Sequence, residues 1–211
     1  GIRTTKPEVG EIARCVFDCA GDTQLCTQRQ VMAQRAHHHT QGDVHRVIGR
    51  TAAIGEAAQI LGDHAGDFDF VSSPLGRTRD TMERVRTAMG LPPGDYRLDD
   101  RLKELSFGDW EGSTLPELAQ RAPERVEERA RQKWGFIPPG DDAESYEILS
   151  WRIGAWLTSV ERQTVCVSHG GVIRSCFRLI GNVSEDEACE MNIPQDRILK
   201  IDRDRKLIGW I

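Results

Sequence analysis

The chain has 211 residues, 38% hydrophobic and 29% charged, and carries a formal net charge of −5. This length suits a single domain over residues 1–211 with a substantial buried core. The acidic balance disfavours broad binding of nucleic acid, because such binding depends on neutralising phosphates. No apolar run approaches the roughly 18 residues of a membrane span, and residues 1–11 lack the apolar core of a secretory signal. We therefore expect a cytoplasmic protein without nucleic-acid or membrane partners.

The cysteine and histidine patterns do not form a recognisable metal site. None of the six cysteines belongs to a CxxC pair, so we expect reduced thiols, with a structural disulfide as the alternative. The histidine triplet His37, His38 and His39 invites a metal interpretation. Consecutive side chains point in different directions on any regular element, however, so a polar loop is favoured. We predict neither a metal nor a cofactor.

The first half of the chain predicts strands that run into turns and helices. A short apolar segment at residues 14–19 is expected to form a strand that ends at a glycine turn. Residues 48–61 show the 3.6-residue apolar period of a helix. Residues 68–71 form a second short apolar segment, which we expect to be a strand.

A helix is predicted from about Pro74 to Met89, ending before Gly90. Ser73 is the expected N-cap, with Pro74 at the first helical position. Arg77 falls in the first turn, where a positive charge opposes the helix dipole. Such a placement suggests a functional role for Arg77, and a surface salt bridge is the alternative.

Further along, Thr114 and Glu117 form a capping-box pattern before a charged helix predicted at residues 115–131. Ser145 is the expected cap of a helix at residues 146–160. Between these helices lies a turn-rich segment, within which Trp134 and Phe136 could form a lid over a substrate. The tail, residues 197–211, is expected to form a closing hairpin.

The most informative stretch is residues 163–174, Q-T-V-C-V-S-H-G-G-V-I-R. It predicts a buried strand that delivers His169 to the carboxyl edge of a sheet, two glycines, and then a helix. A helix amino end carries free N–H groups and partial positive charge, so it suits an anion. A tight turn with a solvent-facing histidine is the alternative. Strands alternating with helices indicate a three-layer α/β/α sandwich with a mostly parallel central sheet.

Three segments in this order give the chain a family resemblance: S-S-P-L-G-R-T at residues 72–78, R-L-K-E-L-S-F-G-D-W-E-G at 101–112 and V-S-H-G-G-V-I-R at 167–174. With them the chain resembles the histidine phosphatase (phosphoglycerate mutase-like) superfamily, most strongly over residues 48–180. The resemblance implies a phosphoglycerate mutase-like fold. It also implies phosphoryl transfer through a phosphohistidine, with no metal required.

The resemblance assigns roles to four residues. His169 matches the family's second histidine, Glu104 its acid donor, and Arg77 its phosphate-binding arginine, while Gly170 lies in the phosphate-binding motif. A glutamate in that role works best when its pKa is raised toward neutrality. The alternative for Glu104 is an exposed loop carboxylate.

The sequence departs from the family at the nucleophile. The chain contains no Arg-His-Gly, and the best alignment places Cys19-Ala20-Gly21-Asp22-Thr23 where the family has Arg-His-Gly-Glu-Thr. Ala20 then occupies the nucleophile position, and alanine cannot attack phosphorus. A displaced histidine from the 37–45 region is a further candidate for the nucleophile.

Two functions follow from this pattern. The first is a phosphomonoester hydrolase, or mutase, that acts on a small phosphorylated metabolite, inactivated if no other nucleophile replaces the lost histidine. The second is a catalytically silent member that binds a phosphorylated ligand or a protein partner. The sequence also allows a homodimer.

Overall fold

The computed structural model describes residues 13–18, 54–55, 58–59 and 61–211. Ala20, the 37–39 histidine triplet and most of the predicted helix at 48–61 lie outside the described residues. The members of that helix that are described, at 54–55, 58–59 and 61, are helical.

The centre of the described chain is a six-stranded sheet with strand order β3-β2-β4-β1-β5-β6. Its parallel strands are β1 (Ala13–Asp18), β2 (Asp69–Ser72), β3 (Arg97–Leu98) and β4 (Thr164–Ser168). The antiparallel strands β5 (Leu199–Asp202) and β6 (Leu207–Trp210) form the predicted closing hairpin beside β1. The prediction of a mostly parallel sheet is confirmed.

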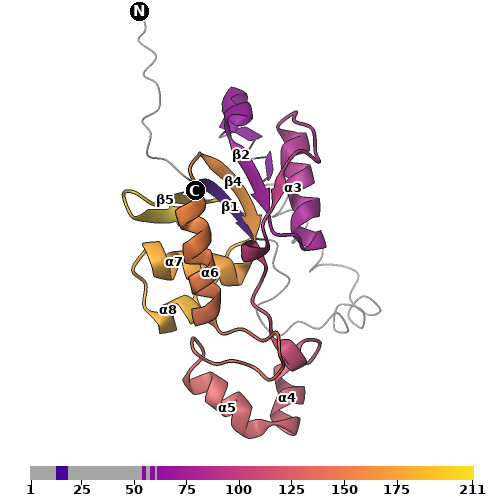
Figure 1. Cartoon of the computed structure of the whole chain (residues 1–211), viewed down its shortest axis with the longest axis vertical. Helices are drawn as coiled ribbons and strands as arrows, with labels where there is room; N and C mark the ends of the chain where they lie inside the picture. The colour runs from indigo at the N-terminus through magenta and orange to yellow at the C-terminus, as the bar shows by residue number, and fades with distance from the viewer. Residues whose placement is uncertain (1–12, 19–53, 56–57, 60) are drawn as a thin grey trace, which may run out of the picture.

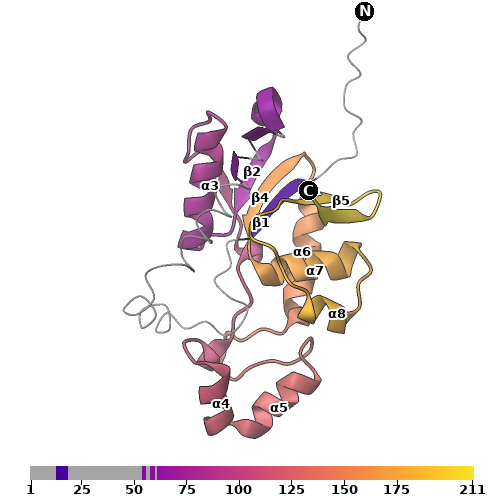
Figure 2. The same cartoon turned by 180° about the vertical axis from the view of Figure 1, so that it is seen from behind.

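Helices cover both faces of this sheet (Figures 1 and 2). One face carries α3 (Gly76–Ala88). The opposite face carries α6 (Tyr146–Ser159), α7 (Gly170–Ile180) and the short α8 (Glu185–Glu190), which the sequence did not predict. Three 3-10 turns connect these elements: η1 (Gly62–Asp67), η2 (Asp100–Leu102) and η3 (Gly108–Trp110). The predicted three-layer α/β/α sandwich is therefore confirmed.

The central strand β4 explains why both faces must be covered. All five of its residues are buried, and successive side chains point to opposite faces. Val165 and Val167 pack in the cluster that contains Met82 of α3. Cys166 packs in the other cluster, with Ile153 of α6.

The predicted start of α3 is wrong. The helix begins at Gly76 rather than Pro74, and Leu75 occupies the N-cap position without a side-chain hydrogen bond. Ser73, the expected cap, places its hydroxyl against His169 instead. The same hydroxyl accepts a longer hydrogen bond, of 3.5 Å, from the Leu75 N–H, so its shorter contact is with a distant residue and it does not cap the helix.

The single helix predicted at 115–131 is two helices, α4 (Leu115–Arg121) and α5 (Pro123–Arg131). Pro123 separates them because proline lacks an N–H and its ring clashes with the preceding turn. The capping box of Thr114 and Glu117 is confirmed at the start of α4, and the Ser145 cap is confirmed at the start of α6.

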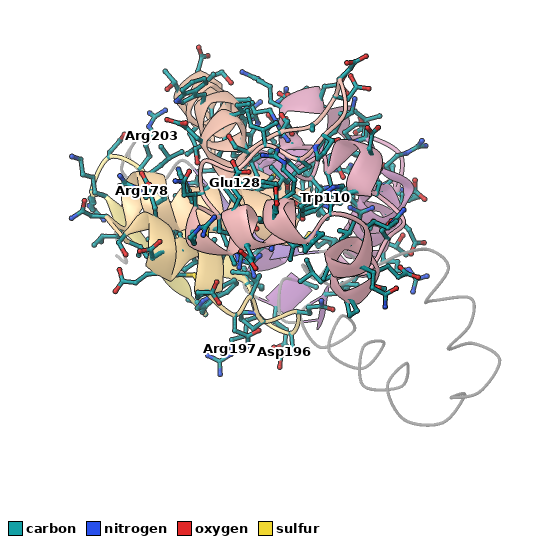
Figure 3. All side chains as sticks on the ribbon, turned by 90° about the horizontal axis from the view of Figure 1, so that it is seen from below. Trp110, Glu128, Arg178, Asp196, Arg197 and Arg203 are labelled. Carbon is teal, nitrogen blue, oxygen red and sulfur yellow. The ribbon has the colours of Figure 1, made fainter. Side chains whose placement is uncertain are left out.

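The helices α4 and α5 lie beyond the carboxyl ends of the strands, as Figure 1 shows. In the view from below, polar side chains such as Glu128 of α5 crowd this part of the molecule (Figure 3). The aromatic residues proposed as a lid are buried here. Trp134 stacks on Tyr146 with ring centroids 5.5 Å apart, and Phe136 packs on Trp110 at 5.2 Å. These rings therefore hold the segment together by packing.

Within the described residues, no helix combines the length and apolar character that crossing a membrane requires.

We predict that Ile153→Ala lowers the free energy of unfolding by about 2–5 kcal/mol, because it removes a fully buried side chain and leaves a cavity. Trp151, on the same helix, is 68% exposed, so Trp151→Ala should change stability by less than about 0.5 kcal/mol. Urea denaturation of both variants measures the difference. Equal losses in the two variants would contradict this placement of α6.

Candidate functional site

The parallel strands end at one edge of the sheet, and the predicted site residues follow them. Ser72 of β2 lies opposite Val167 of β4, and Asp18 of β1 lies opposite Ser168. Ser73 and Arg77 follow β2, Glu104 follows β3 and His169 follows β4 directly. Because the ends of parallel strands meet at one edge, residues far apart in sequence converge here.

His169 is fully buried at this edge, where it precedes the first residue of α7. Its Nδ1 lies 3.1 Å from Arg77 Nη2, and its Nε2 lies 2.8 Å from Ser73 Oγ. A guanidinium can only donate hydrogen bonds, so Nδ1 accepts from Arg77 and the ring proton on Nε2 is donated to Ser73. These partners fix the tautomer of the imidazole.

The same surroundings keep the His169 imidazole uncharged. Burial, followed by the positive charges of Arg77 and Arg152, lowers the pKa of His169 from 6.5 to about 3. His169 is therefore neutral at physiological pH.

Glu104 lies at the amino end of α7. Its carboxylate accepts hydrogen bonds from the backbone N–H of Leu105, at 2.9 Å, and of Gly171, at 3.2 Å. The sequence predicted that this helix amino end suits an anion, and the group beside Gly171 is the carboxyl group of Glu104. A Cβ at position 171 would overlap that carboxylate, so glycine here leaves the space that Glu104 occupies.

Burial raises the pKa of the Glu104 carboxyl group above its ordinary value. The hydrogen bonds from Leu105 and Gly171, and the charges of Arg77 and Arg174, oppose this shift without cancelling it. Glu104 consequently keeps its proton to a higher pH than an exposed glutamate does.

The structure thus brings together all four described residues that the sequence singled out. Arg77 is exposed and contacts His169, Gly170 is the buried first residue of α7, and Glu104 reaches Gly171. Together they offer one permanent positive charge, a neutral imidazole and a carboxyl group able to hold a proton. Such a set can bind an anion and protonate a leaving group beside it.

Sequence reasoning missed residues that support this site. It assigned Ser73 to a helix cap, and it did not consider Glu144 or Arg152. Arg152 donates hydrogen bonds to backbone carbonyls of the segment that carries Glu104. The available signal was an arginine next to the buried Ile153 in a helix whose buried residues are mostly apolar.

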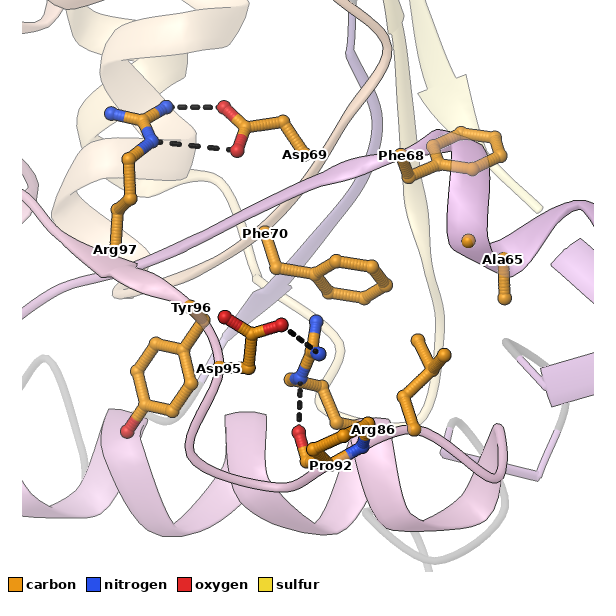
Figure 4. Close-up of a pocket in the computed structure, with 11 residues that line it drawn as sticks. Ala65, Phe68, Asp69, Phe70, Arg86, Pro92, Asp95, Tyr96 and Arg97 are labelled. Atoms are coloured by element: carbon orange, nitrogen blue, oxygen red, sulfur yellow. Dashed lines mark hydrogen bonds and ion pairs between the residues drawn. The ribbon is translucent and has the colours of Figure 1, made fainter.

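A separate cavity of about 350 Å³ lies at the opposite end of β2 (Figure 4). Its lining includes Phe70 and Arg86. The Arg86 Nε donates to the carbonyl of Pro92 at 2.7 Å, and its guanidinium lies 4.4 Å from the centroid of the Phe70 ring. Arg86 is thus engaged in packing the end of α3, and the cavity contains none of the predicted site residues. Among the described residues, no three metal-ligating side chains gather anywhere.

The pKa of His169 predicts how stability depends on pH. Between about pH 3 and 6.5 the unfolded chain binds a proton at this histidine that the folded chain does not. The stability that the buried neutral His169 contributes, of the order of a few kcal/mol, is therefore present above pH 6.5 and is lost as the pH falls toward 3. Denaturation of the wild type and of His169→Gln across this range should show a shallower pH dependence in the variant. Identical slopes would contradict the burial of a neutral imidazole.

Comparison with known proteins identifies the family. A model of the histidine phosphatase superfamily (branch 1) matches residues 49–208, a range that begins after Ala20 and includes Arg77, Glu104 and His169. The bifunctional protein Rv2228c of Mycobacterium tuberculosis is 37% identical over 131 residues, which are 60% of this chain and 34% of that protein. The chain thus spans about a third of the length of this relative. Glucosyl-3-phosphoglycerate phosphatase of the same species is 32% identical over 138 residues, 60% of this chain and 59% of that protein.

Solved structures agree with this assignment. The structure of mycobacterial glucosyl-3-phosphoglycerate phosphatase matches with a TM-score of 0.53 and 25% identity, over 78% of this chain and 82% of that one. Its complex with inorganic phosphate matches with a TM-score of 0.52 and 25% identity, over 78% and 83% of the two chains. The α-ribazole phosphatase of Shigella flexneri, at 22% identity and a TM-score of 0.59 over 75% and 78% of the chains, shares the fold. Because the family model covers most of the chain, this protein belongs to the histidine phosphatase superfamily.

Proposed function

We propose that this site binds the phosphoryl group of a small phosphorylated metabolite and is the site of a histidine-phosphatase-type phosphomonoester hydrolase. The observation that carries the proposal is the contact between Arg77 and His169 at the sheet edge where Glu104 holds a raised pKa. Arg77 would bind the phosphate oxygens, with His169 and Gly170 at their side. Glu104 would protonate the leaving oxygen.

Two properties of the site favour a phosphomonoester over a neutral ligand. The Arg77 guanidinium is exposed and carries a permanent charge that can pair with phosphate oxygens through two parallel hydrogen bonds. The raised pKa of Glu104 favours its protonated, uncharged form, which an anionic ester repels less than a carboxylate does. The phosphate complex of the mycobacterial phosphatase lends further support to this ligand class.

Hydrolysis needs a nucleophile in line with the leaving oxygen. The phosphohistidine route of the family would use position 20, which is alanine here. Removing the nucleophile of an unrelated covalent enzyme costs about 10⁶ in rate. An active protein would therefore depend on another side chain or on direct attack by water.

The alanine favours a second candidate function, a silent family member that binds a phosphorylated ligand or a protein partner without turnover. In this case Arg77, His169 and Gly170 would still bind the phosphate, while Glu104 would have no leaving oxygen to protonate. Binding without hydrolysis would distinguish this function from the first. The homodimer, the cytoplasmic location, the single domain over residues 1–211 and the lack of a metal requirement remain predictions.

The first test concerns binding. We expect Arg77→Met to weaken the affinity for inorganic phosphate by about tenfold to a hundredfold, because it removes a charge-assisted hydrogen bond. Arg84→Met is the matched control: Arg84 is exposed on the same helix and pairs with Asp80. Isothermal titration should find its phosphate affinity within about twofold of the wild type. An equal loss in both variants would mean that phosphate binds elsewhere or through net charge alone.

The second test concerns catalysis, with an aryl phosphate as substrate. We expect the double substitution Cys19→Arg, Ala20→His to raise the hydrolysis rate by at least about 10²-fold over the natural chain, because it supplies the missing nucleophile. The rescued activity should fall as the pH rises through the raised pKa of Glu104 and should be abolished by adding Glu104→Gln.

A double variant that folds and binds phosphate but stays inert would refute the assignment of position 20. If the natural chain already hydrolyses the ester as fast as the double variant, a nucleophile other than residue 20 operates.

A further inference from the structure

We infer that Arg152 is a positioning residue for Glu104. Together with Glu144, it fixes the path of residues 101–106, the irregular segment on which Glu104 is presented. This inference rests on the proposed role of Glu104 as the proton donor. Arg152 itself lies on α6 and acts through the backbone of that segment.

All five N–H groups of Arg152 donate hydrogen bonds, three to backbone carbonyls of this segment and two to the carboxylate of Glu144. Its Nη1 donates to the carbonyls of Arg101, at 2.6 Å, and Lys103, at 2.7 Å, and its Nη2 donates to the carbonyl of Glu104, at 3.2 Å. The carboxylate of Glu144 accepts the other two hydrogen bonds, from Nε at 2.8 Å and from Nη2 at 2.7 Å. Only the planar fork of arginine can serve these acceptors together.

Other contacts complete the support. The Ser168 hydroxyl donates to the carbonyl of Leu102 at 2.9 Å, and the Glu144 N–H donates to the carbonyl of Ser106 at 3.0 Å. The side chains of Leu102 and Leu105 are buried on either side of Glu104. After the 3-10 turn η2, residues 103–106 belong to no helix or strand, so these carbonyl contacts from α6 and β4 help to fix their course.

The position of the Glu104 carboxylate depends on this backbone path. Its oxygens accept from the N–H of Leu105, which belongs to the same segment, and of Gly171, which belongs to α7. A displacement of the segment would draw the carboxylate away from Gly171 and toward water. Arg152 thereby controls both the location of the proton and the burial that retains it.

The experiment measures the titration of the Glu104 carboxyl group by NMR in the isotope-labelled, ligand-free protein. The charged and titratable groups that act on Glu104 come from three helices: Arg77 of α3, Tyr146 of α6 and Arg174 of α7. Arg152→Lys leaves all three in place and keeps its own positive charge, but it cannot serve the five acceptors. We expect the Glu104 pKa in this variant to fall toward its ordinary value, because burial of the carboxyl group decreases.

Arg203→Lys is the matched control. Arg203, labelled in Figure 3, donates to the carbonyls of Leu157 and Val160 at 3.0 and 3.2 Å and pairs with Asp204. It therefore braces the carboxyl end of α6 in a similar manner without touching residues 101–106. The Glu104 titration should remain at its wild-type value in Arg203→Lys, even if the melting temperatures of the two variants fall equally.

Glu144→Gln provides a second, milder variant in case Arg152→Lys does not fold. It keeps the shape of the side chain but weakens its hold on Arg152, so the Glu104 pKa should move in the same direction by a smaller amount. A Glu104 titration that is unchanged in every folded variant would overturn the inference. An unfolded Arg152→Lys together with an unchanged titration in Glu144→Gln would overturn it too, because Arg152 would then be purely structural.

A catalytic readout separates this inference from the proposed function. In the Cys19→Arg, Ala20→His protein, adding Arg152→Lys should lower aryl phosphate hydrolysis by about 10²-fold, since a displacement of the acid by about 1 Å has a cost of that size. The affinity for inorganic phosphate should stay within about twofold. If the double variant shows no hydrolysis at all, the assignment of position 20 fails while the titration of Glu104 still decides the role of Arg152.

Discussion

The site depends on the parallel pairing of β4 with its two neighbours. Since β1 and β2 run beside β4 in the same direction, the segments that follow all three strands begin at one edge. This arrangement places Arg77 within hydrogen-bonding distance of His169 although 92 residues separate them along the chain. An antiparallel neighbour would have delivered its next residues to the opposite edge, and these groups could not have met.

Burial tunes the two titratable groups at this edge in complementary ways. Loss of water disfavours the charged form of each group, so the pKa of His169 falls while that of Glu104 rises. Both shifts favour the neutral form of the group, and Arg77 remains as a fixed charge accessible to an anion. Under the proposed function, a phosphate dianion would be attracted by Arg77, and the raised pKa of Glu104 would lessen the repulsion from its carboxyl group.

Under the proposed function, binding and turnover depend on different segments of the chain. The residues proposed to bind phosphate and to protonate the leaving oxygen follow β2, β3 and β4, whereas Ala20, which the family resemblance aligns with the nucleophile, follows β1 in the sequence. Loss of the nucleophile at position 20 would therefore leave the sequence of the proposed phosphate-binding segments unchanged. The support of Glu104 by Arg152 is likewise independent of position 20, because it reaches the site from α6.

The sequence by itself determined most of the elements and their order, although it missed β3 and α8. The apolar run of β4, the capping box of α4 and the apolar periods of the helices are local signals, and three spaced motifs identified Arg77, Glu104 and His169 as a group. Local signals failed where a distant partner competes with a near one. Ser73 accepts a hydrogen bond from His169 and does not cap α3. The break of the helix predicted at 115–131 has a local cause, Pro123, which the prediction overlooked.

Only the tertiary structure decided how these residues are held and charged. The Glu104 side chain lies at the amino end of α7, where the sequence predicted that an anion would bind, because Gly171 leaves room for it. Arg152 serves three carbonyls that are about 50 positions away along the chain, and no periodicity or capping pattern encodes such contacts. A pKa depends on burial and on the charges nearby in space. Sequence spacing does not specify either quantity until the chain has folded.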